Sequence, residues 1–158
     1  MKLKGKEKFF WERNFNIKRI DAIPSVIDGI TGIDSDHDDQ FFYYLTTYVK
    51  SAHHVHLRCT FLTDEGVKYI CRLEHLKELT LKDHRGITKD CLPDINKLVE
   101  LEYLDISKNN ILPEDLLQLD NLKQLKQLHI SSEKTGEDLQ QQLAMLAAQF
   151  AGCQITNY

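Results

Sequence analysis

The chain has 158 residues, of which 42% are hydrophobic and 28% are charged, as in an ordinary globular domain. Its 20 basic and 24 acidic residues give a formal net charge of −4, which argues against a general nucleic-acid-binding surface. Because no apolar run reaches the roughly 20 residues of a membrane helix, and the four cysteines form no C-x-x-C pair, we expect one cytoplasmic domain with free thiols packed in its core.

Residues 1–50 predict an N-terminal cap followed by an irregular first repeat. The aromatic run Phe9-Phe10-Trp11 is expected to pack on that repeat, and a membrane-surface anchor is the alternative. We expect an edge strand at 16–22, an insertion over 23–39 and a helix over 39–50, capped by Asp38 or Asp39. Phe42, Leu45 and Val49 should face the core of the domain.

The insertion is strongly acidic, with six aspartates and no lysine or arginine over residues 21–49. It is interpreted either as a solvated loop or as an acidic patch that docks a basic partner. A calcium loop is disfavoured, because Asp39 and Leu45 stand where an EF-hand needs glycine and glutamate. The candidate patch consists of Asp34, Asp36, Asp38 and Asp39.

Residues 51–135 repeat the frame L-x-x-L-x-L, which predicts one short strand per copy. The central apolar residues are Val55, Leu79, Leu104 and Leu128, with a degenerate fifth copy centred on Cys153. Successive centres are 24 or 25 residues apart. A second pattern in step with the first predicts a short helix after each strand. These helices are expected to begin at the N-caps Thr63, Thr88 and Thr135 and, in the remaining copy, at Pro113 in the first turn.

Residues 136–158 predict a terminal cap made of an amphipathic helix at 136–149 and a strand at 153–157. With its five copies in register, the chain resembles a leucine-rich repeat protein over residues 49–158. The pieces Leu62-Thr63-Asp64-Glu65-Gly66 and Gly86-Ile87-Thr88 are similar to the cysteine-containing and ribonuclease-inhibitor-like subclasses. A fainter similarity, at Ile20-Asp21-Ala22, is to the mitochondrial coupling factor B of ATP synthase.

The resemblance implies an α/β fold, a right-handed solenoid with about six parallel strands on its concave side and helices on its convex side. The family asparagine that follows each core is kept only at Asn109, and Thr60, His84 and Glu133 stand in the other copies. The resemblance also implies binding of a protein through the concave face. Alternation along each strand places the candidate binding residues on that face: His54, His56, Arg58, Glu78, Thr80, Lys82, Tyr103, Asp105, Ser107, Gln127 and His129.

Arg19 is expected to extend the row of His54, and Gln154 the row of His56. We predict a non-enzymatic interaction module, acting as an inhibitor, immunity-type protein or adaptor, with no catalytic residue, cofactor, metal, nucleic acid or membrane. Its partner would be a protein, with a basic toxin or nuclease as one candidate, and the chain would be a monomer or one subunit of a heteromeric complex.

Two alternatives remain open. A metal-dependent or hydrolytic enzyme would use His54 and His56 with Glu78 as zinc ligands, or a dyad of Asp105 and His129. A structural assembly subunit would be stable only inside a larger complex.

Overall fold

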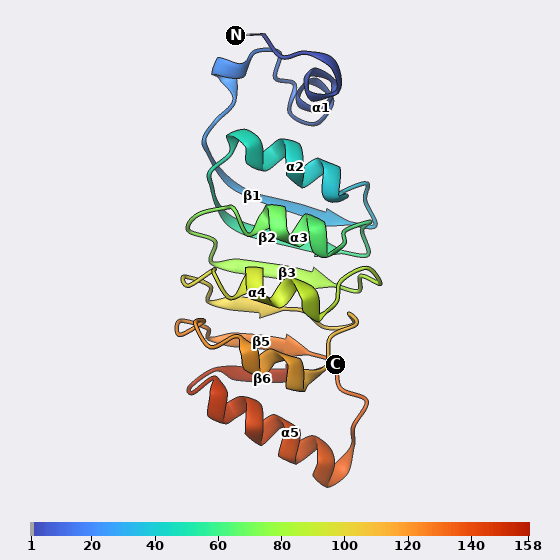
Figure 1. The fold of residues 1–158 in the computed structure, drawn as a ribbon, viewed down its shortest axis with the longest axis vertical. Coiled ribbons are helices and arrows are strands. Elements are labelled where there is room, and N and C mark those ends of the chain that lie inside the picture. The colour runs from blue at the N-terminus through green and yellow to red at the C-terminus, as the bar shows by residue number, and fades with distance from the viewer. Residues whose placement is uncertain (1) are drawn as a thin grey trace.

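The computed structural model describes residues 2–158 and shows an α/β fold built on one parallel six-stranded sheet. The strands follow one another across the sheet in chain order (Figure 1). Parallel neighbours need a crossover, and here each crossover carries a helical segment. The strands are β1 (Val26–Ile33), β2 (Ser51–Arg58), β3 (Glu78–Lys82), β4 (Tyr103–Asp105), β5 (Gln127–Ile130) and β6 (Gln154–Asn157).

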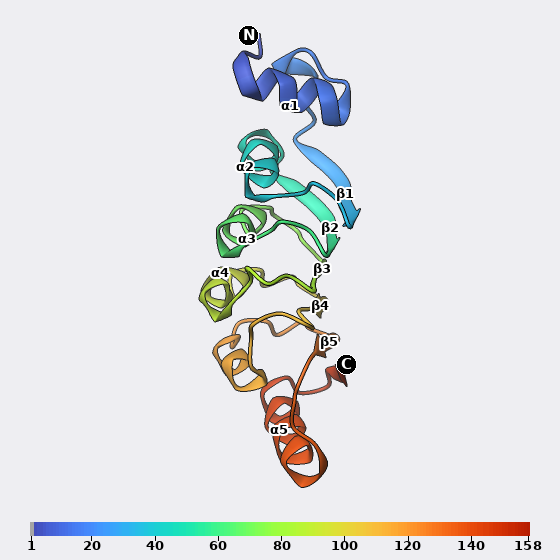
Figure 2. The same ribbon diagram turned by 90° about the vertical axis from the view of Figure 1, so that its right-hand side faces the viewer.

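The crossover helices lie on one side of the column of strands and leave the opposite sheet face uncovered (Figure 2). We call this uncovered side the open face. The α-helices are α1 (Gly5–Phe15), α2 (Asp39–Tyr48), α3 (Asp64–Ile70), α4 (Leu92–Ile95) and α5 (Gly136–Gln149), and the 3-10 helices are η1 (Ile20–Ala22), η2 (Lys89–Cys91) and η3 (Pro113–Gln118).

The repeating frame predicts the register of the central strands. Val55 pairs with Leu79, Leu79 with Leu104 and Leu104 with Leu128, and all four side chains are fully buried. The fifth copy was placed wrongly, because Leu128 pairs with Ile155 and not with Cys153. Cys153 belongs to the turn that ends α5, where its N–H donates to the carbonyl of Phe150 at 3.0 Å.

The first strand also differs from the prediction. The expected strand at 16–22 is wrong: Ile20–Ala22 is a 3-10 turn, and β1 lies inside the predicted insertion. Ile30 of β1 pairs with Val55, 25 residues later, so β1 continues the period of the repeats. Gly32 interrupts the apolar frame there, since it pairs with the buried Leu57. A side chain at Gly32 would collide with those of Ser35 and His37, so the local packing requires the glycine that hides the pattern.

Consecutive helical segments are joined by a repeated carboxylate contact. The Asp39 carboxylate accepts hydrogen bonds from the Thr63 N–H and hydroxyl at 2.8 and 2.6 Å. One repeat later, Asp64 accepts the same pair from Thr88 at 2.8 and 2.7 Å. Each threonine also caps its own helix, as predicted, by accepting from the N–H two residues ahead. Thr135 stands at the predicted cap position of α5 but makes no such side-chain bond.

A row of polar contacts joins the loops that follow β2, β3 and β4. Asn109 Oδ1 accepts from the backbone N–H of His84 at 2.8 Å, and His84 Nε2 lies 2.9 Å from the Thr60 hydroxyl. Asn109 therefore satisfies a backbone group of the neighbouring loop, whereas His84 and Thr60 contact each other through their side chains.

Both ends of the sheet are covered by helices. At the N-terminal end, Phe10 and Trp11 of α1 are buried against α2, with the Phe10 ring 5.1 Å from that of Phe41. Phe9 instead remains 64% exposed. At the other end, α5 has the predicted bounds and buries Leu146 and Phe150. The core therefore runs the length of the column between two caps.

Candidate functional site

The predicted binding residues lie in rows across the open face. One row joins Gly29, His54, Glu78, Tyr103, Gln127 and Gln154, and the next joins Thr31, His56, Thr80, Asp105, His129 and Thr156. Most lateral neighbours expected from the sequence are therefore correct. Two are wrong. Gly29 takes the place expected for Arg19, and Gln154 continues the row of His54 instead of the row of His56. Both errors arise because the repeats at the two ends are degenerate, so the sequence predicted β1 and β6 at the wrong positions.

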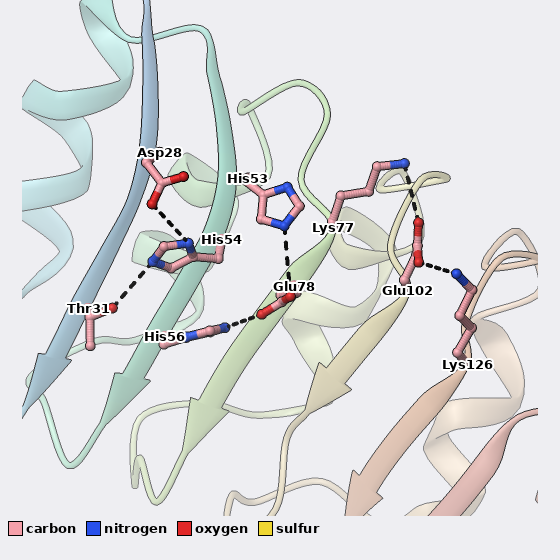
Figure 3. Close-up of polar contacts among 9 residues, drawn as sticks. All are labelled: Asp28, Thr31, His53, His54, His56, Lys77, Glu78, Glu102 and Lys126. Atoms are coloured by element: carbon pink, nitrogen blue, oxygen red, sulfur yellow. Dashed lines mark hydrogen bonds and ion pairs between the residues drawn. The ribbon is translucent and has the colours of Figure 1, made fainter.

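Two histidines of β2, His53 and His56, point towards Glu78 of β3 (Figure 3). Glu78 Oε2 lies 2.9 Å from His56 Nε2, and its Oε1 lies 3.8 Å from His53 Nε2. His54 turns the other way, towards β1, with its Nδ1 4.0 Å from Asp28 Oδ2. His54 and His56 therefore do not converge with Glu78 on one point, as a shared zinc ion would require.

The sequence prediction missed His53, because it occupies the first variable position of the frame, which strand alternation does not assign to the open face. The same position in the following repeats carries Lys77, Glu102 and Lys126. Glu102 forms ion pairs with Lys77, at 3.5 Å, and with Lys126. A ladder of alternating charges thus borders the rows at their amino-terminal edge (Figure 3). The charges of this ladder pair with one another at the surface, so the ladder offers little free charge to a partner.

An aromatic cluster occupies the other half of the open face. The Tyr103 ring lies 5.0 Å from that of His129, which stacks at 5.5 Å on Tyr158. Lys82 Nζ lies 4.3 Å from the centre of the Tyr158 ring. Burial among these groups raises the pKa of Tyr103 above its ordinary value. Tyr158, the last residue, was not predicted to join this face.

Asp105 and Ser107 are buried, and this corrects their place among the predicted contact residues. The Asp105 carboxylate accepts hydrogen bonds from the Ser107 hydroxyl at 2.6 Å and from the Ser107 N–H at 3.0 Å. It pairs laterally with His129, as expected, but its hydrogen bonds are used to shape the turn after β4. A dyad of Asp105 and His129 is not formed in this arrangement.

A third row lies at the carboxyl ends of the first three strands and consists of Ile33 on β1, Arg58 on β2 and Lys82 on β3. Ile33 is 62% exposed although it is apolar. A hollow of about 350 Å³ opens beside this row, and Thr80, His56 and Tyr103 are among the residues that line it. Gln127, on β5, is exposed outside the hollow. Predicted contact residues from β2, β3 and β4 meet in this hollow, and a second hollow, lined by Glu78, Tyr103 and Gln127, joins those of β3, β4 and β5.

Half of the predicted acidic patch is used by the fold. Asp38 caps α2 by accepting from the Phe41 N–H at 2.8 Å, and Asp39 holds Thr63. Asp36 is exposed and lies 3.7 Å from Arg13 of α1. Asp34 is exposed at the end of β1. Asp36 and Asp38 nevertheless line one hollow beside α1, so part of the predicted patch shares a surface.

The cysteine thiols are held in their protonated form. Burial raises the pKa of Cys71 and Cys91 well above the usual thiol range, and that of Cys153 to about 11. Cys59 lies 3.4 Å from an Asp83 carboxylate oxygen, and its pKa is raised by burial and by that carboxylate. Thiols of this kind are weak nucleophiles at neutral pH.

Within residues 2–158, no three His, Cys, Asp or Glu side chains are grouped so that they could hold a metal ion. The helices in the same range are all too short or too polar to cross a membrane. Comparison of the chain with protein-family models and with curated protein sequences gave no match.

Proposed function

We propose that the chain is a leucine-rich repeat protein whose open face binds another protein. The observation that supports this most strongly is the contrast between the two sides of the strands. Leu104 and its equivalents are fully buried, whereas their neighbours Tyr103, Gln127 and Glu78 lie in register on a face that no helix covers. Regular strands with a period of 24 or 25 residues and two helical caps are typical of that family.

The side chains of the open face fit protein recognition better than chemistry. Tyr103 and Arg58 belong to the residue types that contribute most to protein interfaces. The carboxylates best placed for catalysis are engaged, Glu78 with His56 and Asp105 with Ser107. Binding is itself the proposed activity, as in an inhibitor, an adaptor or an assembly factor.

A pull-down from native lysate tests this proposal. Wild-type protein should retain one or more proteins that a Tyr103→Ala/Arg58→Glu variant loses, because both side chains project from the open face. The matched control is Leu117→Ala/Lys123→Glu, which changes an exposed apolar and an exposed basic residue on the helix-bearing side. Equal retention by the wild type and by the open-face variant, with both folded, would reject the open face as the binding surface.

A further inference from the structure

The N-terminal cap gathers positive charge at one end of the column. Residues 2–19 hold seven basic and two acidic residues, a net charge of +5, whereas residues 20–158 carry −9. Lys2 pairs with Arg19 in an isolated antiparallel bridge, so the start of the chain lies beside the segment that follows α1. Folding therefore brings two basic stretches together on the same cap.

Four cations of this cap have no counterion. They are exposed, and within residues 2–158 they form no ion pair: Lys2, Lys4, Lys6 and Lys18. Both arginines of the cap are engaged, Arg13 with Asp36 at 3.7 Å and Arg19 with Asp21. The charge that remains unpaired is carried by lysines alone.

The neighbouring carboxylates reduce this charge but do not cancel it. Glu12 pairs with Lys8 at 3.8 Å and is already counted in the +5. Asp36 and Asp38 line the hollow beside α1, and Asp21 lies just after the cap. If these three aspartates are counted in full with residues 2–19, the net charge is still +2.

An exposed aromatic ring stands on the outer side of α1. Phe10 and Trp11 are buried against α2. Because successive residues of a helix are turned by about 100°, Phe9 lies on the side opposite to these two rings, with Lys6 and Arg13 one turn away along the helix. The Arg13 guanidinium lies 5.9 Å from the centre of the Phe9 ring. The outer side of α1 is thus an exposed apolar ring beside basic groups.

The placement of α1 suits contact with a flat surface. The helix lies across the N-terminal end of the column, so its outer side can meet a plane along its length (Figure 1 and Figure 2). From β1 to β6 the column extends by about 24 Å, at about 4.8 Å per strand. Charges are screened beyond about 8 Å at physiological salt, so most of the acidic remainder of the chain exerts little repulsion at the cap.

The residue types favour a diffuse anionic surface over a partner with fixed anionic groups. Lysine carries a compact charge on a flexible stem, whereas bidentate recognition of a fixed carboxylate or phosphate favours arginine. An apolar ring flanked by lysines is typical of protein segments that lie in the interface of a bilayer. Anionic lipids attract such basic segments.

We propose that the N-terminal cap binds the surface of anionic lipid bilayers. The free lysines contact the headgroups, and the Phe9 ring enters the interface between headgroups and acyl chains. The sequence left a membrane-surface anchor open for Phe9-Phe10-Trp11, and the structure leaves Phe9 alone available for it. The open face lies along the side of the column, so this contact is independent of the proposed binding of a protein.

Flotation with lipid vesicles tests the proposal. Wild-type protein should bind vesicles that contain about 30% phosphatidylglycerol at least about tenfold more tightly than vesicles of phosphatidylcholine alone. Raising the salt concentration from about 0.1 M to about 0.5 M should remove most of this binding, because salt screens charges at a surface.

Charge reversal identifies the cap as the binding surface. Lys4→Glu/Lys6→Glu should weaken binding to the anionic vesicles by about tenfold or more. Both positions lie at the N-terminal end of α1, where the helix dipole favours acidic side chains, so the fold should be retained. The matched control Lys89→Glu/Lys123→Glu reverses two exposed lysines on the helix-bearing side and should bind as the wild type does. If melting shows that the cap variant is unfolded, Lys4→Gln/Lys6→Gln replaces it.

The Phe9 ring is tested separately. Phe9→Ala keeps the charge and should weaken binding by about threefold, because binding scales with the buried apolar area. In Phe9→Trp, lipids brominated along their acyl chains should quench the fluorescence of the new side chain. The single native tryptophan, Trp11, is buried and should not be quenched in the wild type.

Several outcomes would overturn the proposal. These are equal binding to neutral and anionic vesicles, no binding to either, normal binding by the charge-reversed variant, and no quenching in Phe9→Trp. A DNA duplex or an acidic peptide that binds as tightly as the anionic vesicles, and is lost in the charge-reversed variant, would identify a soluble polyanion as the partner and overturn it as well.

Discussion

Single buried leucines carry much of the stability of this sheet. Leu104 is 0% exposed at the centre of β4 and pairs with equivalent leucines on both sides. Leu104→Ala should lower the free energy of unfolding by about 2–5 kcal/mol, because a closely packed core refills the cavity only in part. Urea denaturation measures the change. Leu117→Ala, whose parent side chain is 39% exposed, is the control and should stay within about 0.5 kcal/mol. Equal stability of the two variants would contradict the assigned core.

A buried histidine makes stability depend on pH. His84 is 1% exposed, and burial lowers its pKa below the usual value of about 6.5. As the pH falls through that value, the unfolded chain binds a proton that the folded chain does not, so the free energy of unfolding decreases. His37 acts in the same direction, because burial lowers its pKa too.

The loss of stability between about pH 7.5 and about pH 5.5 should therefore be smaller in His84→Gln than in wild type. Urea denaturation at the two pH values measures it. A wild-type loss that persists in full in His84→Gln would exclude His84 as its source.

At the scale of elements, the carboxylate contacts between consecutive helical segments hold short repeats together. Asp64 satisfies both the N–H and the hydroxyl of Thr88. Asp64→Ala should cost about 1–3 kcal/mol, since it leaves a partly buried backbone donor without a partner. A double-mutant cycle with Thr88→Ala should be non-additive, because both changes remove one contact. The exposed Asp90→Ala is the control, and strict additivity of the cycle would contradict the contact.

The predicted elements differ from the observed ones mainly where repeats are short or degenerate. The helix expected after β3 begins as the 3-10 turn η2, and the helix expected after β4 is the 3-10 helix η3 throughout. The longer segments α2 and α5 match their predicted ranges closely. Hydrophobic spacing predicts the bounds of a helix well only where the helix is several turns long.

For the whole molecule, stability should spread from neighbour to neighbour along the column. Trp11 of α1 is 1% exposed and contacts Tyr48 of α2, with ring centroids 6.0 Å apart. Trp11→Ala should raise the hydrogen-exchange rates of α1, α2 and β1 far more than those of β4 and β5, because each repeat contacts only its neighbours. Phe9→Ala, at an exposed site, should change neither set. A uniform increase would indicate that the fold opens as one cooperative unit.

The sequence alone determined the parallel strands β2 to β5, their register and the side of each that is buried. These features depend on spacing along the chain, because successive side chains of a strand point to opposite faces of the sheet. The lateral neighbours of His54 and His56 on β3, and both lateral neighbours of Tyr103, followed from the same rule.

Only the tertiary structure decided where β1 begins, and which polar groups on the open face are free. Gly32 takes the place of an apolar residue of the frame because the side chains of Ser35 and His37 fill the space beside it. Asp105 turns to Ser107, His53 reaches Glu78, and Tyr158 stacks on His129. These contacts depend on side-chain rotamers and on the position that folding gives to Tyr158 beside β5. A one-dimensional period gives the position of a residue, whereas its contacts depend on packing around it.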